Sequence, residues 1–152
     1  MKFAIKLRVF LLVTTPVLLV GCGLVSRNEV ARVASPDGHV EAVLIETNGG
    51  TTTSFGYEIY VVENGRPPRD RVAWLYGAAR NPQAYGANLK WTSENDLVIE
   101  YREAREEILK RTTVSLAGRT IKVALRSGVN DSTAPAGGML YNLELARVGK
   151  PK

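Results

Sequence analysis

Apolar and polar residues alternate along most of the chain between residues 30 and 125, which predicts short β-strands separated by turns. The first two predicted strands, residues 30–34 and 39–47, flank the tetrapeptide Ser35-Pro36-Asp37-Gly38. This tetrapeptide is typical of a tight turn, because Pro presets φ, Asp bonds its own backbone and Gly tolerates positive φ. The second segment is apolar on both faces, which favours a central strand. We therefore predict a hairpin at this point.

The same alternation predicts further strands at residues 55–63 and 72–76, and the first of these ends at an Asn-Gly turn signal. Two more hairpins are predicted, with strands at residues 89–91 and 97–101 and at residues 112–116 and 120–125. Residues 102–110 are predicted to form one short helix, because Arg102, Glu106 and Lys110 are four residues apart, the spacing at which opposite charges pair along a helix. The predicted fold class is mainly β, an antiparallel meander or sandwich of about seven strands with one short helix.

Most of the remaining segments are predicted to be loops. Residues 48–54 and 77–88 flank strands that bring them to one end of the sheet, and the second loop contains Arg80 and Tyr85. Arg and Tyr are the residue types that anchor protein interfaces, so we take these two as candidate binding residues. Residues 127–138 are rich in small residues. Residues 139–148 are apolar enough to dock on the domain, as a strand or as a helix.

The N-terminus has the three parts of a secretory leader: the basic residues Lys2, Lys6 and Arg8, a short apolar run, and small residues before a cleavage point. The apolar run from residue 9 to residue 20 is shorter than the roughly 20 residues of a membrane-spanning helix. It ends in Leu19-Val20-Gly21-Cys22, which resembles the lipobox of bacterial lipoproteins.

The lipobox resemblance implies cleavage between Gly21 and Cys22 and attachment of lipid to the Cys22 thiol, since a thiolate is the side-chain nucleophile available near neutral pH. Two or more acyl chains hold a protein firmly on a membrane. In Gram-negative lipoproteins an Asp after the lipidated Cys retains the protein at the inner membrane. Gly23 stands there in this chain, so we expect the outer membrane, with the domain facing the periplasm.

These features divide the chain into four parts: a signal peptide (1–21), the lipidated Cys and a tether (22–28), a β-rich domain (29–126), and a loop with a C-terminal tail (127–152). Cleavage removes 21 of the 152 residues, which leaves 131 residues, enough for one domain. It also removes three positive charges, so the formal net charge falls from +5 to +2. The remaining basic residues are interleaved with acids, so we do not expect nucleic-acid binding.

Candidate chemistry is sparse. His39 is the only histidine and Cys22 the only cysteine, so neither a zinc site nor a Ser-His-Asp triad is expected, and no cofactor is implied. A pair of acids can hydrolyse glycosidic bonds, but solvent-facing strand positions explain the acids of this chain. Those considered for such a pair are Glu41, Glu46, Glu58, Glu63, Glu100 and Glu103.

Three further segments carry a resemblance to a family of small, poorly characterised bacterial lipoproteins. They are Thr53-Ser54-Phe55-Gly56-Tyr57-Glu58, Ala84-Tyr85-Gly86 and Leu89-Lys90-Trp91, in addition to the Ser35–Gly38 tetrapeptide. The resemblance covers residues 35–125 and implies no catalytic residues. The sequence therefore predicts an envelope protein anchored to the membrane by lipid on Cys22, with a non-catalytic binding or structural role toward a protein or cell-wall partner. The alternative is an envelope hydrolase or enzyme inhibitor.

Overall fold

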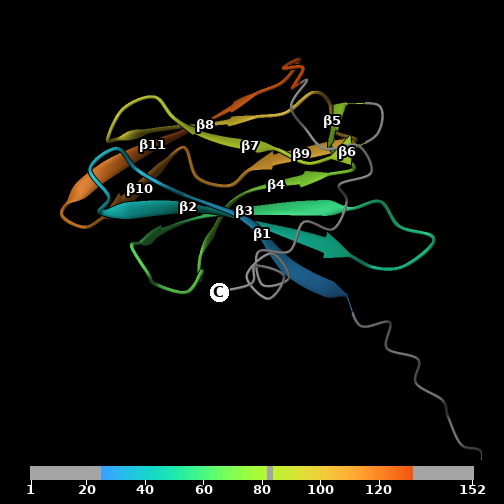
Figure 1. Ribbon diagram of the computed structural model, residues 1–152, viewed down its shortest axis with the longest axis horizontal. Helices are drawn as coiled ribbons and strands as arrows, with labels where there is room; N and C mark the ends of the chain where they lie inside the picture. The colour runs from blue at the N-terminus through green and yellow to red at the C-terminus, as the bar shows by residue number, and fades with distance from the viewer. Residues whose placement is uncertain (1–24, 82–83, 132–152) are drawn as a thin grey trace, which may run out of the picture.

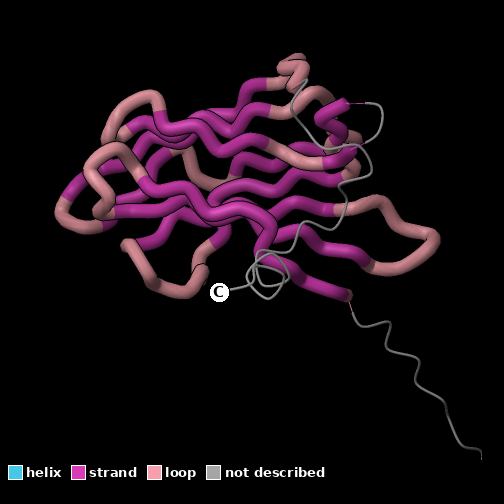
Figure 2. The backbone as a smooth tube through the Cα atoms, in the orientation of Figure 1, coloured by secondary structure: helices cyan, strands magenta, loops and turns pink. Residues whose placement is uncertain are grey.

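Eleven β-strands make up the part of the chain that the computed structural model describes, residues 25–81 and 84–131 (Figures 1 and 2). No helix occurs within these residues. The strands are β1 (Ser26–Ala34), β2 (Val40–Asn48), β3 (Gly56–Glu63), β4 (Arg71–Tyr76), β5 (Ala79–Asn81), β6 (Ala84–Tyr85), β7 (Asn88–Trp91), β8 (Asp96–Glu100), β9 (Glu106–Leu109), β10 (Thr113–Leu116) and β11 (Arg119–Arg126).

Nine of these strands form two sheets, which confirms the predicted mainly β fold. The first sheet has the order β1-β2-β3-β4-β9 and the second the order β10-β11-β8-β7, while β5 and β6 form a separate two-stranded ribbon. Neighbouring strands are antiparallel, except that β8 and β11 are parallel. Figure 1 shows the two sheets as layers, one above the other.

The hydrophobic core is built from alternate residues of both sheets, because successive side chains of a strand point to opposite faces. Val40 and Ile59 of the first sheet and Ile99 and Ile121 of the second are each 0% exposed. Each fully buried side chain of this size stabilises the fold by about 1.5–3 kcal/mol relative to an exposed one. A smaller cluster of Val43, Ile45, Tyr60 and Val62 lies on the opposite face of the first sheet.

Polar contacts join the two sheets. Trp91 Nε1 on β7 donates to the backbone oxygen of Val33 on β1, at 3.0 Å. Arg119, at the start of β11, pairs through both terminal nitrogens with the two carboxylate oxygens of Asp37, in the β1–β2 turn. The bonds from Arg119 and Ser35 hold the pKa of Asp37 well below its usual range. These contacts fix the β1–β2 turn against the second sheet.

The domain has two distinct ends. At one end, which we call the entry end, Ser26 pairs with Asn48, and the Gly77 amide donates to the Phe55 carbonyl at 2.7 Å. The first strand therefore begins beside the β2–β3 loop and the start of the β4–β7 segment, as Figure 1 shows on the right. At the other end, the turn end, lie the turns after β1, β3, β7 and β10.

The predicted turns are confirmed in detail. Gly38 has φ +75°, which an L-residue with a side chain rarely adopts, and Gly65 has φ +73°. Ala117 and Gly118 have φ +50° and +73°, the combination of a type I′ hairpin turn. Ala117 is the one non-glycine residue with positive φ in the described ranges.

Among the predictions from the sequence that are wrong, two concern the path of the backbone. Residues 102–110 do not form a helix, because Glu106–Leu109 pair with β4 as the edge strand β9. Helical pairing of charges contributes only about 0.2–0.5 kcal/mol per pair, and the backbone bonds to β4 outweigh it. Residues 26–28 are not a tether, because β1 begins at Ser26 and pairs with β2 from that residue onward. The predicted leader, Gly21, Cys22, Gly23 and the apolar segment 139–148 lie outside the described residues.

Candidate functional site

A groove of about 580 Å³ opens at the turn end, between the β3–β4 loop and β10. This volume lies within the range of small-ligand and peptide sites. The two walls come from different sheets and from residues about fifty positions apart in the chain, so the groove exists only in the folded domain. We call it the arginine groove; its lining residues are Val61, Val62, Glu63, Arg66, Pro67, Arg69, Asp70, Arg111, Val114, Ser115 and Leu116.

Three arginines give the groove its chemical character. With the described residues, Arg66 and Arg111 make only long ion pairs, to Glu63 at 4.0 Å and to Asp70 at 3.7 Å. Exposed ion pairs of this kind contribute between zero and about 1 kcal/mol, so an incoming anion can replace them. Arg69 takes part in no ion pair or hydrogen bond with the described residues, and its side chain is exposed. Guanidinium groups bind carboxylate and phosphate in bidentate fashion.

The apolar part of the groove comes from the strands. Val61 and Val62 are 7% and 6% exposed, and Val114 and Leu116 on β10 are partly buried. The pairing of β3 with β4 ends at Tyr60, so residues 61–63 continue beyond β4 and are paired only with β2. This overhang leaves the space that the groove occupies. The arrangement suits a ligand that combines an anionic group with an apolar part.

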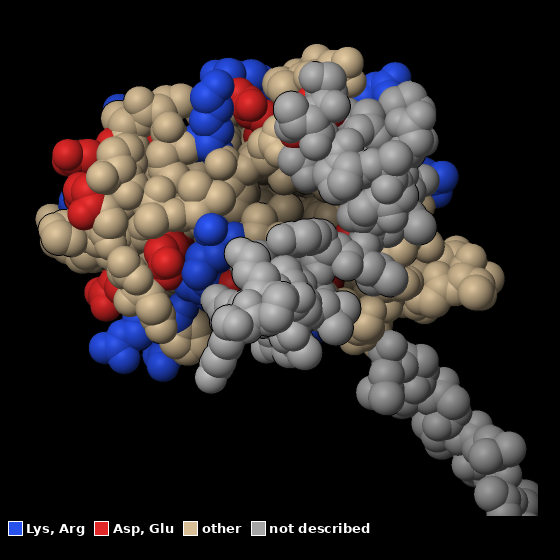
Figure 3. Space-filling view, viewed as in Figure 1, with Lys and Arg blue, Asp and Glu red and all other residues tan. Residues whose placement is uncertain are grey.

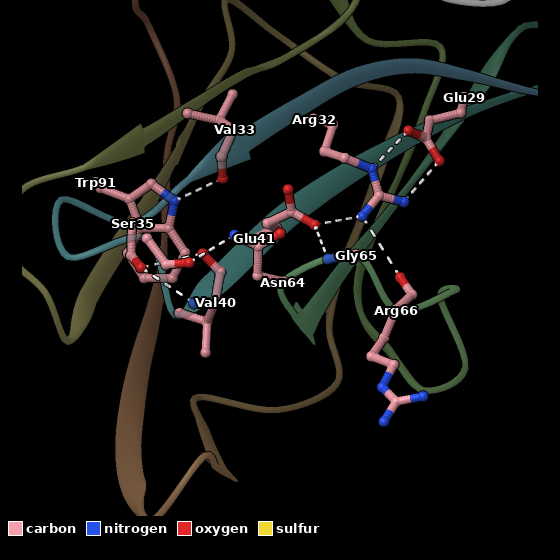
Figure 4. A network of polar contacts seen from close by, with 11 residues as sticks. Glu29, Arg32, Val33, Ser35, Val40, Glu41, Asn64, Gly65, Arg66 and Trp91 are labelled. Carbon is pink, nitrogen blue, oxygen red and sulfur yellow. Dashed lines mark hydrogen bonds and ion pairs between the residues drawn. The ribbon is translucent and has the colours of Figure 1, made fainter.

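A network around Arg32 positions the loop that forms one wall of the groove (Figure 4). Arg32 donates two bonds to Glu29, at 2.7 and 2.9 Å, and one to Glu41 Oε2, at 2.6 Å. The same Glu41 oxygen accepts the backbone N–H of Gly65 at 2.9 Å, and Arg32 also reaches the Arg66 carbonyl at 3.4 Å. The start of the β3–β4 loop is thus bound to side chains of β1 and β2.

The electrostatics of this network follow from the same contacts. Burial opposes ionisation of Glu41, but the Gly65 N–H and the Arg32 guanidinium outweigh it and lower the pKa of Glu41. The paired acids, Glu29 first, raise the pKa of Arg32. Asn64 completes the attachment, since its side chain donates to the Gly38 carbonyl at 2.7 Å and its backbone N–H donates to the His39 carbonyl at 3.0 Å.

A second network crosses the same sheet face. Glu58 on β3 binds Arg71 at 2.9 Å, accepts the Tyr60 hydroxyl at 2.9 Å, and forms an ion pair with Arg27. Burial opposes ionisation of Glu58, but the hydrogen bonds from Arg27 and Tyr60 outweigh burial and lower the pKa of Glu58. The Arg71 guanidinium also lies 5.7 Å from the centre of the Trp74 ring, a cation–π contact.

The expectation that the strand acids face solvent is wrong for four of them: Glu41, Glu46, Glu58 and Glu100 are buried. Three of these pair with arginines, Glu100 with Arg126 at 2.8 Å. Glu46 is different. It is 2% exposed, its Oε2 accepts the Tyr57 hydroxyl at 2.8 Å, and its Oε1 has no hydrogen-bond partner in the described part of the chain. Burial therefore raises the pKa of Glu46.

The sequence did not single out the arginine groove. Arg66, Arg69 and Asp70 were predicted to lie in a loop, and Arg111 to follow a helix, with no signal to connect them. The one indication of this site in the sequence was a loop directly after the Asn-Gly turn, which contains prolines and two arginines.

The candidate residues Arg80 and Tyr85 lie on β5 and β6, whose backbones pair through Ala79 and Tyr85. Residues 77–88, predicted to be a loop, contain β5 and β6. This segment does meet the β2–β3 loop at the entry end, where the Gly77 amide donates to the Phe55 carbonyl at 2.7 Å. The β2–β3 loop carries no charge and forms the tan projection on the right of Figure 3. His39 directly follows the β1–β2 turn and is exposed.

Comparison of the chain with protein-family models, with curated proteins and with solved structures found no match. Within residues 25–81 and 84–131, no cluster of His, Cys, Asp and Glu has the arrangement of a metal site. The same residues contain no helix that is long and apolar enough to cross a membrane.

Proposed function

We propose that this protein is a lipid-anchored binding protein of the cell envelope, and that it binds an anionic ligand in the arginine groove without catalysing a reaction. The observation that carries the binding role is the groove itself, whose lining combines three arginines with two acids and apolar strand residues. The lipobox sequence supports the anchor. The anchor and the groove would then lie at opposite ends of the domain.

The geometry favours binding over hydrolysis. Hydrolysis by paired acids needs two carboxylates on either side of a ligand, one of them with a raised pKa. In the described residues the acid with a raised pKa is Glu46, which does not line the groove. Asp37, Glu41 and Glu58 are each held by arginine as structural ion pairs.

The groove also lies in a better place than the entry end to meet a partner. If Cys22 is lipidated, only three residues separate it from Ser26, so the entry end must lie within about 14 Å of the lipid attachment point. Arg80 and Tyr85 belong to the segment at that end. The arginine groove faces away from it, where an envelope protein or a cell-wall component has access.

A small amphiphilic anion tests the binding role. Octanoate, added to the isotopically labelled mature chain with Cys22→Ser, should shift the backbone amide signals of residues 61–63, 66, 69, 70 and 114–116. The matched cation octylamine should not. Arg69→Ala, which removes an exposed side chain that has no hydrogen bond or ion pair with the described residues, should weaken octanoate binding several-fold. Shifts confined to residues 79–85 would place the binding site at the entry end instead, and absence of shifts would overturn the groove as a site.

The anchor is tested separately in cells. Cys22→Ala should accumulate as uncleaved precursor and take up no labelled fatty acid. In a Gram-negative host the native protein should fractionate with the outer membrane and Gly23→Asp with the inner membrane. Normal maturation and labelling of Cys22→Ala would overturn the lipid anchor but not the groove.

A further inference from the structure

The strand β10 has one edge that no described residue pairs with. It lies at the border of the second sheet and bonds only to β11. The bond from the Val123 amide to the Thr112 carbonyl, 2.8 Å, fixes which residues of β10 face β11. Because antiparallel strands alternate between bonded and non-bonded pairs, Val114 and Leu116 bond to β11. The N–H and C=O groups of Thr113 and Ser115 therefore point outward.

This free edge is part of the arginine groove. Ser115 lines the groove and also a neighbouring hollow of about 440 Å³ beside the Ala117-Gly118 turn. The unpaired backbone groups thus face a space that continues along the strand. An open edge of this kind accepts an extended peptide as an additional strand.

Both borders of the first sheet are less suitable. In β1 the register shifts between Glu29 and Ala31, and such a bulge interrupts the regular spacing that an added strand needs. The border strand β9 carries Glu106 and Glu107, both exposed. The β10 edge has neither feature, and the groove beside it is lined by three arginines and two acids.

The side chains around the edge define the chemistry of the peptide. In an extended strand alternate side chains point to opposite sides. One set would lie on Val61, Val114 and Leu116, and the other would point to the rim, where Arg66, Arg69 and Arg111 stand. Apolar residues fit the first set and acidic residues fit the second.

We infer that the arginine groove binds an extended, acidic polypeptide segment of a partner protein, which adds as a strand to the free edge of β10. This inference rests on the proposed function of the groove and names its ligand class. Backbone bonds to Thr113 and Ser115 hold the segment, and the arginines select its charge. The interaction is expected to weaken with salt, because the arginines are exposed.

The test uses a soluble probe, a fluorescein-labelled octapeptide of alternating Glu and Val, with the mature chain carrying Cys22→Ser. Saturation with this peptide should slow hydrogen exchange of the Thr113 and Ser115 amides at least tenfold. The Val114 amide, already bonded to β11, should change little. A peptide of alternating Lys and Val serves as the charge control and should not bind.

Two variants at one position separate backbone pairing from side-chain binding. Ser115→Pro removes the outward N–H of residue 115. Proline is tolerated at such positions of an edge strand, so the variant should fold, and it should bind the peptide at least tenfold more weakly. Ser115→Ala keeps the N–H and should bind as the wild type does. If Ser115→Pro fails to fold, the exchange measurement on the wild type still decides.

The outcomes distinguish this inference from the proposed function. Peptide binding without protection of Thr113 and Ser115, or with full affinity in Ser115→Pro, would show that strand addition is wrong. Octanoate binding in the groove without any binding of the Glu-Val peptide would also overturn the inference and leave the proposed function intact. Failure of both probes would overturn both.

Discussion

Replacement of Glu46 by Gln should stabilise the protein at alkaline pH and leave it nearly unchanged at pH 4. The Glu46 carboxylate is 2% exposed and receives a single hydrogen bond, from the neutral hydroxyl of Tyr57. Its second oxygen is buried and has no hydrogen-bond partner among residues 25–81 and 84–131. Gln has the same shape and no charge, and its amide oxygen can accept the same bond from Tyr57.

The variant leaves one buried polar group unpaired, as the wild type does, so the gain comes from removing the charge; an unpaired buried polar group costs about 1–3 kcal/mol, and a charged one costs more. We expect Glu46→Gln to gain at least 1 kcal/mol at pH 8. In a domain of this size that gain raises the melting temperature by about 4 °C or more.

The pH dependence has a definite sign. The raised pKa means that the folded state retains the Glu46 proton to a higher pH than the unfolded chain does. Below the unfolded pKa, about 4.3, both states are protonated and Glu46 costs nothing. The cost grows as the pH rises from there through the folded pKa, and it is complete above that value. The difference between variant and wild type should widen over this range.

Thermal unfolding followed by circular dichroism at pH 4 and pH 8 measures this difference. Glu103→Gln, at an exposed position, is the matched control and should show no widening. An equal difference at both pH values, or a lower melting temperature for Glu46→Gln at pH 8, would refute the reasoning.

Three further predictions concern the turns and the Arg32 network. Gly38→Val should lower the free energy of unfolding by about 1–2 kcal/mol in a denaturant titration; since nothing lies within 4 Å of the added Cβ, the cost is backbone strain at φ +75°. Ala117→Asn should raise the free energy of unfolding by about 0.5–1 kcal/mol, because Asn adopts positive φ more readily than Ala. An unchanged denaturant midpoint would contradict the turn geometry. Glu41→Gln should cost about 1–2 kcal/mol at pH 7. Because the pKa of Glu41 is lowered, that cost should disappear as the pH falls through the folded pKa, and a loss that is constant down to pH 3 would argue against the ion pair.

The hairpins could be predicted from the sequence because their signals are local. Ser35-Pro36-Asp37-Gly38, Asn64-Gly65 and Ala117-Gly118 each specify backbone angles within a few residues, and the flanking alternation specifies the strands. Strand β9 could not be predicted in this way. Its four residues become a strand because β4 offers a free edge, and the local charge spacing favours a helix.

The arrangement of the groove was not predictable for the same reason. Its walls meet through the packing of two sheets, and no pattern in one sequence relates Arg69 to Ser115. Glu41 and Glu58 can be buried because arginines of neighbouring strands pair with them: Arg32, Arg27 and Arg71. The register between the strands brings these residues together. An acid within a strand that is apolar on both faces, such as Glu46, was the one local indication of a buried carboxylate.

The path of the chain through the two sheets has a consequence for folding. After β8 in the second sheet, the chain returns to the first sheet to form β9, and only then supplies β10 and β11 to the second. The parallel pairing of β11 with β8 therefore closes a long loop that contains β9. Neither sheet is a continuous piece of the chain, so neither can be completed or lost independently of the other. We expect unfolding in one cooperative step, and a ligand that spans the groove should raise the melting temperature of the whole domain.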